Sequence, residues 1–173
     1  KPNANSSSRV AAGMFNAIIP RRVTKTWMAE PLFDYLHSYY PSLEKEIGVN
    51  FFHKKEVIHP FEWQKEQNDW LGKIKQVEFK NYFEDNALIY PDYPLLQSPL
   101  GGVIIKQGGY CHSGNMLDAF EVYFKEKGCY KEAFINSNAI KLDQGNYSIE
   151  GINYDKIIFC EGVENTSNKW FNE

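Results

Sequence analysis

Several features that would assign this protein to a special class are missing from its sequence. No run of 18 apolar residues occurs, so the sequence predicts no membrane-spanning helix. The formal net charge is −3, whereas surfaces that bind nucleic acids show a basic excess, so we expect no nucleic-acid partner. The opening residues, "KPNANSSS", carry no apolar segment of the kind found in secretory signal peptides.

Cysteine and histidine are also scarce. Cys111, Cys129 and Cys160 are odd in number and widely spaced, which is typical of reduced thiols in a cytoplasmic protein rather than of a disulfide framework. The four histidines show neither CxxC nor HxxxH spacing with each other or with the cysteines. We therefore expect a cytoplasmic protein without a metal site.

Aromatic residues, by contrast, are abundant. They make up 16% of the 173 residues, and 43% of the chain is hydrophobic. This is enough apolar side chain for the core of one domain, with room for a small annex.

The first half of the chain predicts helices around a pair of strands. Ser8 is placed to cap a helix over residues 9–15, and the periodicity of 24–40 predicts a second helix. We expect Pro41 to end that helix and begin a short one closed by Gly48. Strands are expected on either side of Lys54 and Lys55, followed by helical spacing in "FEWQKEQNDWLGKI".

The second half predicts a strand at 103–105, a helix capped by Ser113 and stopped by Gly128, and a β-meander. The meander would contain "AIKLD", "YSIEG" and "DKIIFCEG", with turns at "QGN" and "IN". The unbroken apolar run "IIFC" is typical of a strand buried on both faces. The expected fold class is α/β (α+β), with a mixed, largely antiparallel sheet and helices packed on one side.

Three short stretches could contact a ligand, although each also has a purely structural interpretation. In "SSSRVAAGMFN", serines at a helix start could hold phosphate, and Ala-Ala-Gly would let a flat group approach the backbone; a capped surface helix explains the same residues. "YDKIIFCEG" could deliver backbone to a ligand or be a core strand with a turn. "GGYCHSGN" could aim Tyr110 or His112 at a ligand or simply join a strand to a helix.

The order of these segments resembles a known family. The stretches "SSSRVAAGMFN", "KTWMAEPLFDYL", "FFHKKEVIHPF", "GGVIIKQGGYCHSGNMLDAF" and "YDKIIFCEG" are similar to an internal piece of the FAD-dependent oxidoreductases of the D-amino-acid oxidase, glycine oxidase and sarcosine oxidase superfamily. The resemblance covers nearly the whole chain. Where the family has a small residue followed by glycine after the last strand, this sequence has Cys160-Glu161-Gly162.

The resemblance implies a division into three parts. Residues 1–22 would be a remnant of the FAD-binding domain, 23–150 the substrate domain, and 151–173 a strand returning to the FAD-binding domain. The family's GxGxxG turn does not occur between Lys1 and Glu173, and we expect it upstream, with the rest of the flavin site downstream. We therefore expect the isolated chain to bind FAD weakly or not at all and to have no oxidase turnover.

The resemblance also implies a reaction and a set of site residues. The parent protein would oxidise a small amine or amino acid by passing hydride to the flavin, which carries the redox chemistry while the protein orients the substrate. His59 and Tyr110 are the candidate substrate contacts, and no catalytic residue is assigned. The implied FAD-binding residues are Ser7, Ser8, Arg9, Ala11, Ala12, Gly13, Glu161 and Gly162.

The aromatic residues leave alternatives open. Trp27, Trp63 and Trp70 could line a groove of a non-catalytic module that binds sugars or peptides, or they could pack a core. A binding module predicts a change in tryptophan fluorescence with ligand and without flavin. A purely structural domain predicts no ligand at all.

Overall fold

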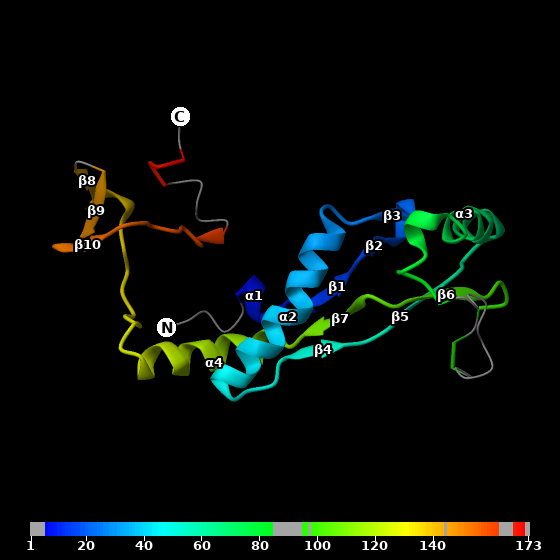
Figure 1. The fold of residues 1–173 in the computed structure, drawn as a ribbon. Helices are drawn as coiled ribbons and strands as arrows, with labels where there is room; N and C mark the ends of the chain where they lie inside the picture. Colours follow the sequence, from blue (N-terminus) through cyan, green and yellow to red (C-terminus); the bar gives the residue numbers. More distant parts are fainter. Residues whose placement is uncertain (1–5, 85–94, 97, 144, 163–167, 172–173) are drawn as a thin grey trace. The chain divides into compact units, whose positions relative to one another are not determined.

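The computed structural model of the chain describes residues 6–84, 95–96, 98–143, 145–162 and 168–171 (Figure 1). The "YPDYPLL" part of the expected proline-rich loop lies largely outside the described residues. The chain divides into two compact units, Lys1–Cys129 and Tyr130–Glu173. These units follow spatial packing, and the division by function at 22/23 and 150/151 stays a prediction.

Helices and several small antiparallel sheets make up the described residues, which confirms the mixed α/β class. The helices are α1 (Ser7–Val10), η1 (Pro20–Arg22), α2 (Ala29–Ile47), α3 (Gln64–Ile74), η2 (Val77–Phe79), α4 (Ser113–Glu126) and η3 (Ser137–Ala139). The strands are β1 (Met14–Asn16), β2 (Ile18–Ile19), β3 (Thr24–Lys25), β4 (Phe52–Lys54), β5 (Val57–Pro60), β6 (Gly102–Ile105), β7 (Gly108–Cys111), β8 (Ile140–Asp143), β9 (Asn146–Ile149) and β10 (Ile152–Tyr154). Instead of one mixed sheet, the described strands form four small sheets in which every pairing is antiparallel.

The centre of the first unit is a long antiparallel ribbon in which β4 and β5 pair with β7 and β6. Phe52 lies opposite Cys111, and Val57 lies opposite Ile105. Between the two paired regions, residues 55–56 face 106–108, so one extra residue sits on the β6–β7 side as a bulge. The strands expected around Lys54 and Lys55 and at 103–105 are therefore confirmed.

Strand β7 is central in its sheet, with β4 on one side and β1 on the other. Met14 and His53 lie opposite Tyr110 and share its face, because side chains alternate across a strand. Phe15 and Phe52 point to the other face, where their rings stack 5.0 Å apart.

Helix α2 covers the face that carries these two phenylalanines. Phe33 packs edge-on against Phe15, and Tyr40 stacks on Phe52 at 5.2 Å. His37 lies among the same rings, where burial and the positive charge of Lys54 lower its pKa, although Asp34 acts in the opposite direction. In this sheet α2 lies on one side, as predicted, and Tyr110, on the other face, is 39% exposed.

The close spacing of these strands requires glycine. A Cβ on Gly109 would lie 2.1 Å from the carbonyl oxygen of His53 and 2.7 Å from the ring of Phe15. A Cβ on Gly13, where φ is +66°, would lie 1.9 Å from the carbonyl oxygen of Cys111. Both positions therefore accept only glycine without a backbone shift.

The main hydrophobic core lies in the first unit, between the β5–β6 ribbon, α3 and the segment around η2. Trp70 of α3 is fully buried, with its ring near those of His59 and Phe83. The helix predicted from "FEWQKEQNDWLGKI" is confirmed by α3, because its period places Trp70 inward. The core consists of Ala17, Ile18, Val23, Phe33, Phe61, Trp70, Phe79, Tyr82, Phe83, Val103 and Ile105.

The expected helix over 9–15 with Ser8 as its cap is wrong. Helix α1 is a single turn that follows Ser6, with no side-chain cap, and the chain then enters β1. The reason is pairing: the amide of Cys111 donates to the carbonyl of Gly13 at 2.9 Å, and β1 then continues along β7. Tertiary strand pairing outweighs the helix propensity of the two alanines.

The expected break at Pro41 is also wrong, because α2 runs through it for 19 residues. Proline removes the donor for the carbonyl of His37, but the rings of Phe33 and Tyr40 hold the helix to the sheet on both sides of that point. The predicted end at Gly48 is confirmed: its φ is +78°, and its amide donates to Glu44.

Helix α4 begins one residue earlier than predicted. His112, not Ser113, is the cap, since its side chain accepts a hydrogen bond from the amide of Asn115. The hydroxyl of Ser113 instead donates to the carbonyl of Ala11. The stop at Gly128 is confirmed, with φ of +67° two residues after the helix ends.

The second unit contains a meander of β8, β9 and β10, in which the first two strands are those predicted and the third lies where the turn at "IN" was expected. The turn between the last two strands is at Glu150 and Gly151, both with positive φ, rather than at "IN". The buried strand expected at "IIFC" is wrong: within the described residues it has no strand pairing, and Ile158 is 85% exposed. An apolar run becomes a buried strand only where neighbouring strands and a second layer cover it.

Candidate functional site

A small pocket lies where the segment after α1 meets the junction of β7 and α4. Its volume is about 160 Å³. It is lined by Arg9, Ala11, Ala12, Tyr110, Cys111, His112, Ser113 and Gly114. Two stretches about a hundred positions apart in the sequence thus form its two walls.

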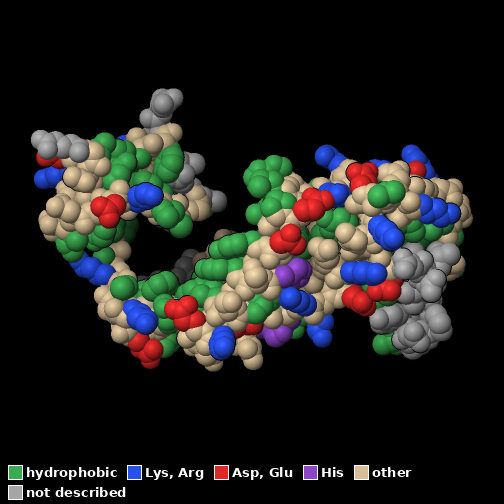
Figure 2. Space-filling model, viewed as in Figure 1, with side chains coloured by type: hydrophobic (Ala, Val, Ile, Leu, Met, Phe, Trp, Pro, Cys, Tyr) green, Lys and Arg blue, Asp and Glu red, His purple; other side chains and the backbone are tan. Residues whose placement is uncertain are grey.

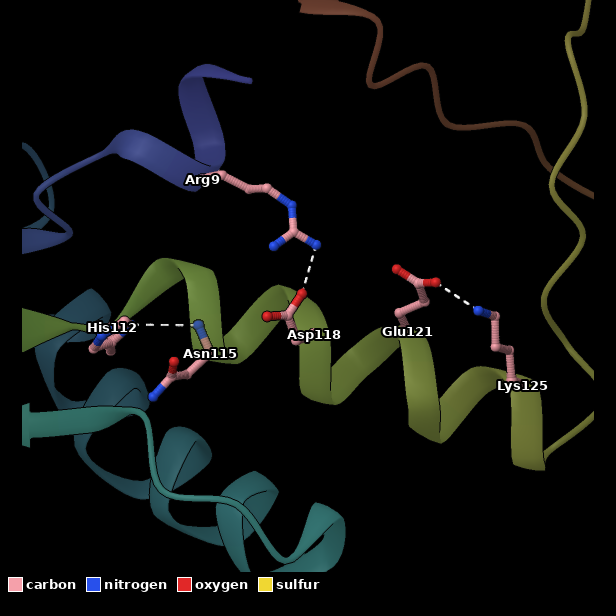
Figure 3. Close-up of polar contacts among 6 residues, drawn as sticks. All are labelled: Arg9, His112, Asn115, Asp118, Glu121 and Lys125. Atoms are coloured by element: carbon pink, nitrogen blue, oxygen red, sulfur yellow. Dashed lines mark hydrogen bonds and ion pairs between the residues drawn. The ribbon is translucent and has the colours of Figure 1, made fainter. Parts of the chain in front are cut away.

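Three contacts hold these walls together. The amide of Cys111 donates to the carbonyl of Gly13 at 2.9 Å, and Ser113 Oγ donates to the carbonyl of Ala11 at 3.0 Å. Arg9 reaches from α1 to α4, where its Nη2 lies 2.6 Å from Oδ1 of Asp118 (Figure 3).

The ion pair with Asp118 holds the guanidinium group of Arg9 at the edge of the pocket. Its hydrogen bond and charge hold the pKa of Asp118 below its usual value and raise the pKa of Arg9. Because the Asp118 side chain is 64% exposed, solvent screens the pair, and it contributes more to position than to stability.

The start of α4 supplies polar donors to the pocket. In a helix the first amides have no intrahelical acceptor and carry a partial positive charge. The amide of Asn115 is bonded to Nδ1 of His112 at 3.3 Å, so in the neutral ring the proton sits on Nε2 (Figure 3). The amides of Ser113 and Gly114 and this ring N–H are donors suited to an anionic or carbonyl oxygen.

Tyr110 joins the pocket to the face of its sheet opposite α2. Its side chain is on the face without α2, is 39% exposed, and lies 4.7 Å from the ring of His53 across the strands. Cys111 faces the opposite way: burial and the nearby Glu44 raise the pKa of its thiol, which contacts the sulfur of Met116. The thiol therefore stays protonated at neutral pH and is a poor nucleophile.

The structure brings together five of the residues that the sequence singled out. Arg9, Ala11 and Ala12, inferred for the cofactor, line the same pocket as Tyr110, inferred for the substrate. His112, the other residue named in the "GGYCHSGN" stretch, lines it too. Gly13 packs on β7 directly beside it. Ser7 and Ser8 are exposed on α1, outside the pocket lining.

His59 is not close to Tyr110. It lies six residues further along the strand pair than His53, which at about 3.3 Å per residue is roughly 20 Å away. Its Nε2 is 3.0 Å from Oε1 of Glu66 on α3, and its ring lies 4.9 Å from that of Trp70. These contacts give His59 a structural role in the core region.

Glu161 and Gly162 belong to the second unit. Oε2 of Glu161 accepts a hydrogen bond from Asn168 at 2.6 Å, and Asn168 is almost fully buried. Gly162 has φ of +61°. Within its own unit, Glu161 therefore anchors the turn at 168–170.

Sequence reasoning did not select His53 or Ser113 as site residues. The sequence places His53 in a predicted strand without a ligand motif, and it marks Ser113 only as a helix cap. Strand alternation would have paired His53 with Tyr110 if the register of β4 on β7 had been known.

The tryptophans do not form a common groove. Trp27 and Trp63 are 77% and 57% exposed and precede different helices, whereas Trp70 is buried in the core. In the part of the chain that the structure describes, no group of three or more histidine, cysteine or acidic side chains could hold a metal ion. None of the helices described is both long and apolar enough to cross a membrane.

Comparison with known proteins adds no assignment. No family model matches the sequence, and no solved structure matches the fold.

Proposed function

We propose that this chain is the substrate-facing part of an FAD-dependent oxidoreductase related to D-amino-acid oxidase, glycine oxidase and sarcosine oxidase. Its parent protein would oxidise a small amine or amino acid. One observation carries the proposal: Arg9, Ala11 and Ala12, inferred for the cofactor, lie in one pocket with Tyr110, inferred for the substrate.

The pocket suits one part of the cofactor. Ala11 and Ala12 have short side chains that permit close approach to the backbone, and the start of α4 with Arg9 favours phosphate or carbonyl oxygens. Its volume of about 160 Å³ is below the roughly 300 Å³ at which sites for whole ligands begin. This size supports the expectation that the isolated chain binds FAD weakly.

A bound flavin would supply the redox chemistry by accepting hydride from the substrate carbon. The chain's own task is to orient the substrate. Tyr110 presents a hydroxyl on the face opposite α2, where it can bond a substrate carboxylate or amine, and the ring of His53 beside it limits its rotation.

The test is a titration of the ¹⁵N-labelled chain with FAD, followed by amide chemical shifts. We expect weak binding, no amine-dependent turnover, and shift changes concentrated at Ala11, Ala12, Ser113 and Gly114. Ala12→Trp, which fills the pocket, should abolish these changes. Val77→Trp, at a position 90% exposed on η2, is the matched control and should keep them.

Two results would count against this proposal. Shift changes confined to residues outside the pocket would remove the support for the proposal. The same holds if no shift changes at the highest FAD concentration that dissolves. A purified chain that is yellow with nearly one flavin per molecule would overturn the expectation of weak binding.

A further inference from the structure

An exposed stripe of large apolar side chains runs along the outer face of α2. It consists of Met28, Leu32, Tyr35 and Tyr39, with Trp27 directly before it; we call these five residues the α2 stripe. They are 45%, 44%, 59%, 42% and, for Trp27, 77% exposed. Their spacing of three and four residues places Leu32, Tyr35 and Tyr39 on one side of the helix.

The described residues cover this stripe only in part and leave 42% to 77% of each of its residues exposed. The sheet is covered by a different face of the helix, which carries Phe33, His37 and Tyr40. Tyr35 and Tyr39 stack on each other, 4.9 Å apart, and Tyr39 also packs edge-on against Tyr40 at 5.6 Å. Figure 2 shows hydrophobic side chains gathered over the region of α2 and α4.

The area of the stripe is that of a weak interface. At roughly 200 Å² for each fully exposed side chain, these exposed fractions correspond to roughly 530 Å² per chain. Two copies face to face would bury about 1,100 Å², which exceeds the roughly 1,000 Å² expected of a biological interface and lies in the range of weak, reversible ones.

The absence of charge in the stripe favours a second copy over a charged partner. None of its five residues is ionisable near neutral pH, so two identical stripes meet without repulsion between like charges. A helical stripe also pairs with itself about a two-fold axis, the commonest arrangement in oligomers. We propose that the α2 stripe is the contact surface of a symmetric homodimer in which α2 packs against α2 of a second copy.

The test is sedimentation equilibrium of the full chain over a range of concentrations from low to high micromolar. We expect a monomer–dimer equilibrium. The double variant Leu32→Lys with Tyr35→Lys should raise the dissociation constant by at least about tenfold, because it places charge at the centre of the contact. The matched control, Val77→Lys with Val122→Lys, changes two other exposed apolar residues and should dimerise like the unaltered chain.

A second measurement locates the contact. In a chain whose exposed Cys129 and Cys160 are changed to serine, Tyr35→Cys should form a disulfide-linked dimer on mild oxidation. Circular dichroism must show that each variant keeps its helices. A chain that stays monomeric at every concentration, or a dimer unaffected by the stripe variant, would overturn the proposal.

Discussion

Individual residues decide how closely the walls of the candidate pocket can approach. Gly13 is the clearest case, because the carbonyl oxygen of Cys111 occupies the space in which a side chain would begin. The resemblance assigned Gly13 to the cofactor, yet the structure gives it a second task, the close approach of the first segment to β7. A substitution there would change both the fold and the pocket.

We predict that Gly13→Ala lowers the free energy of unfolding by more than about 2 kcal/mol, since it combines a left-handed backbone with a backbone clash. Gly48→Ala is the control. Gly48 has a similar φ of +78° but nothing within 4 Å of an added Cβ, so only about 1 kcal/mol should be lost. Urea unfolding followed by circular dichroism measures both; equal losses would contradict the clash.

Residues that line the pocket could be singled out in the sequence only where a local pattern marks them. Ala11 and Ala12 stand out within their own segment, and Tyr110 within its glycine-rich loop. The link between the two stretches depends on the pairing of Met14 with Tyr110, a contact that no local pattern encodes. For the same reason His53 could not be selected beforehand.

Among the elements, α2 departs most from what its sequence indicates. A proline inside a helix costs a hydrogen bond and brings its ring against the preceding turn. Here Pro41 is exposed, and the helix continues because its inner face is held by the sheet. The helix therefore contains a local weakness that tertiary packing offsets.

We predict that Pro41→Ala raises the free energy of unfolding by about 1–3 kcal/mol, because it restores an amide donor for His37. Pro31→Ala is the matched control: Pro31 lies in the first turn, where amides have no intrahelical acceptor, and should change stability little. Chemical unfolding monitored through the helical signal tests both, and a neutral or destabilising Pro41→Ala would contradict the prediction.

Elements with strong periodicity could be predicted, whereas those set by pairing could not. The apolar spacing of α3 and the glycines after α2 and α4 mark these helices in the sequence. Strand β1 lies in a segment whose alanines favour helix, and "IIFC" has strand composition without a partner strand in the described residues. In both cases neighbours in space, rather than propensity, determine the outcome.

At the scale of the whole molecule, the division into two units is the main feature. The principal core lies entirely in the first unit, between Ala17 and Ile105. The second unit has its own meander, closed by the bond from Asn168 to Glu161 and the contact of Trp170 with Tyr147. Residues 129–136 join the two without a helix or strand, and Phe134 is 91% exposed.

We predict that brief digestion with chymotrypsin cuts first after Phe134, because the enzyme needs an aromatic residue in an accessible, extended segment. The larger product should keep the helical signal, since α2, α3 and α4 all lie before the cut. Mass spectrometry identifies the site, and Phe134→Ser should slow the cleavage. A first cut within α2 or α4 would contradict the independence of the first unit.

The extra residue in the β6–β7 strand also bears on how this gene can vary in length. As a bulge, it lets the longer β6–β7 side keep its register with β4 and β5, so that Tyr110 still lies opposite His53. Losing one codon among positions 106–108 would leave two residues facing residues 55–56 and remove the bulge, while Tyr110 and Cys111 keep their partners and their faces. The segment should therefore accept a single-residue deletion more readily than the paired strands, where one lost residue reverses the faces of those beyond it.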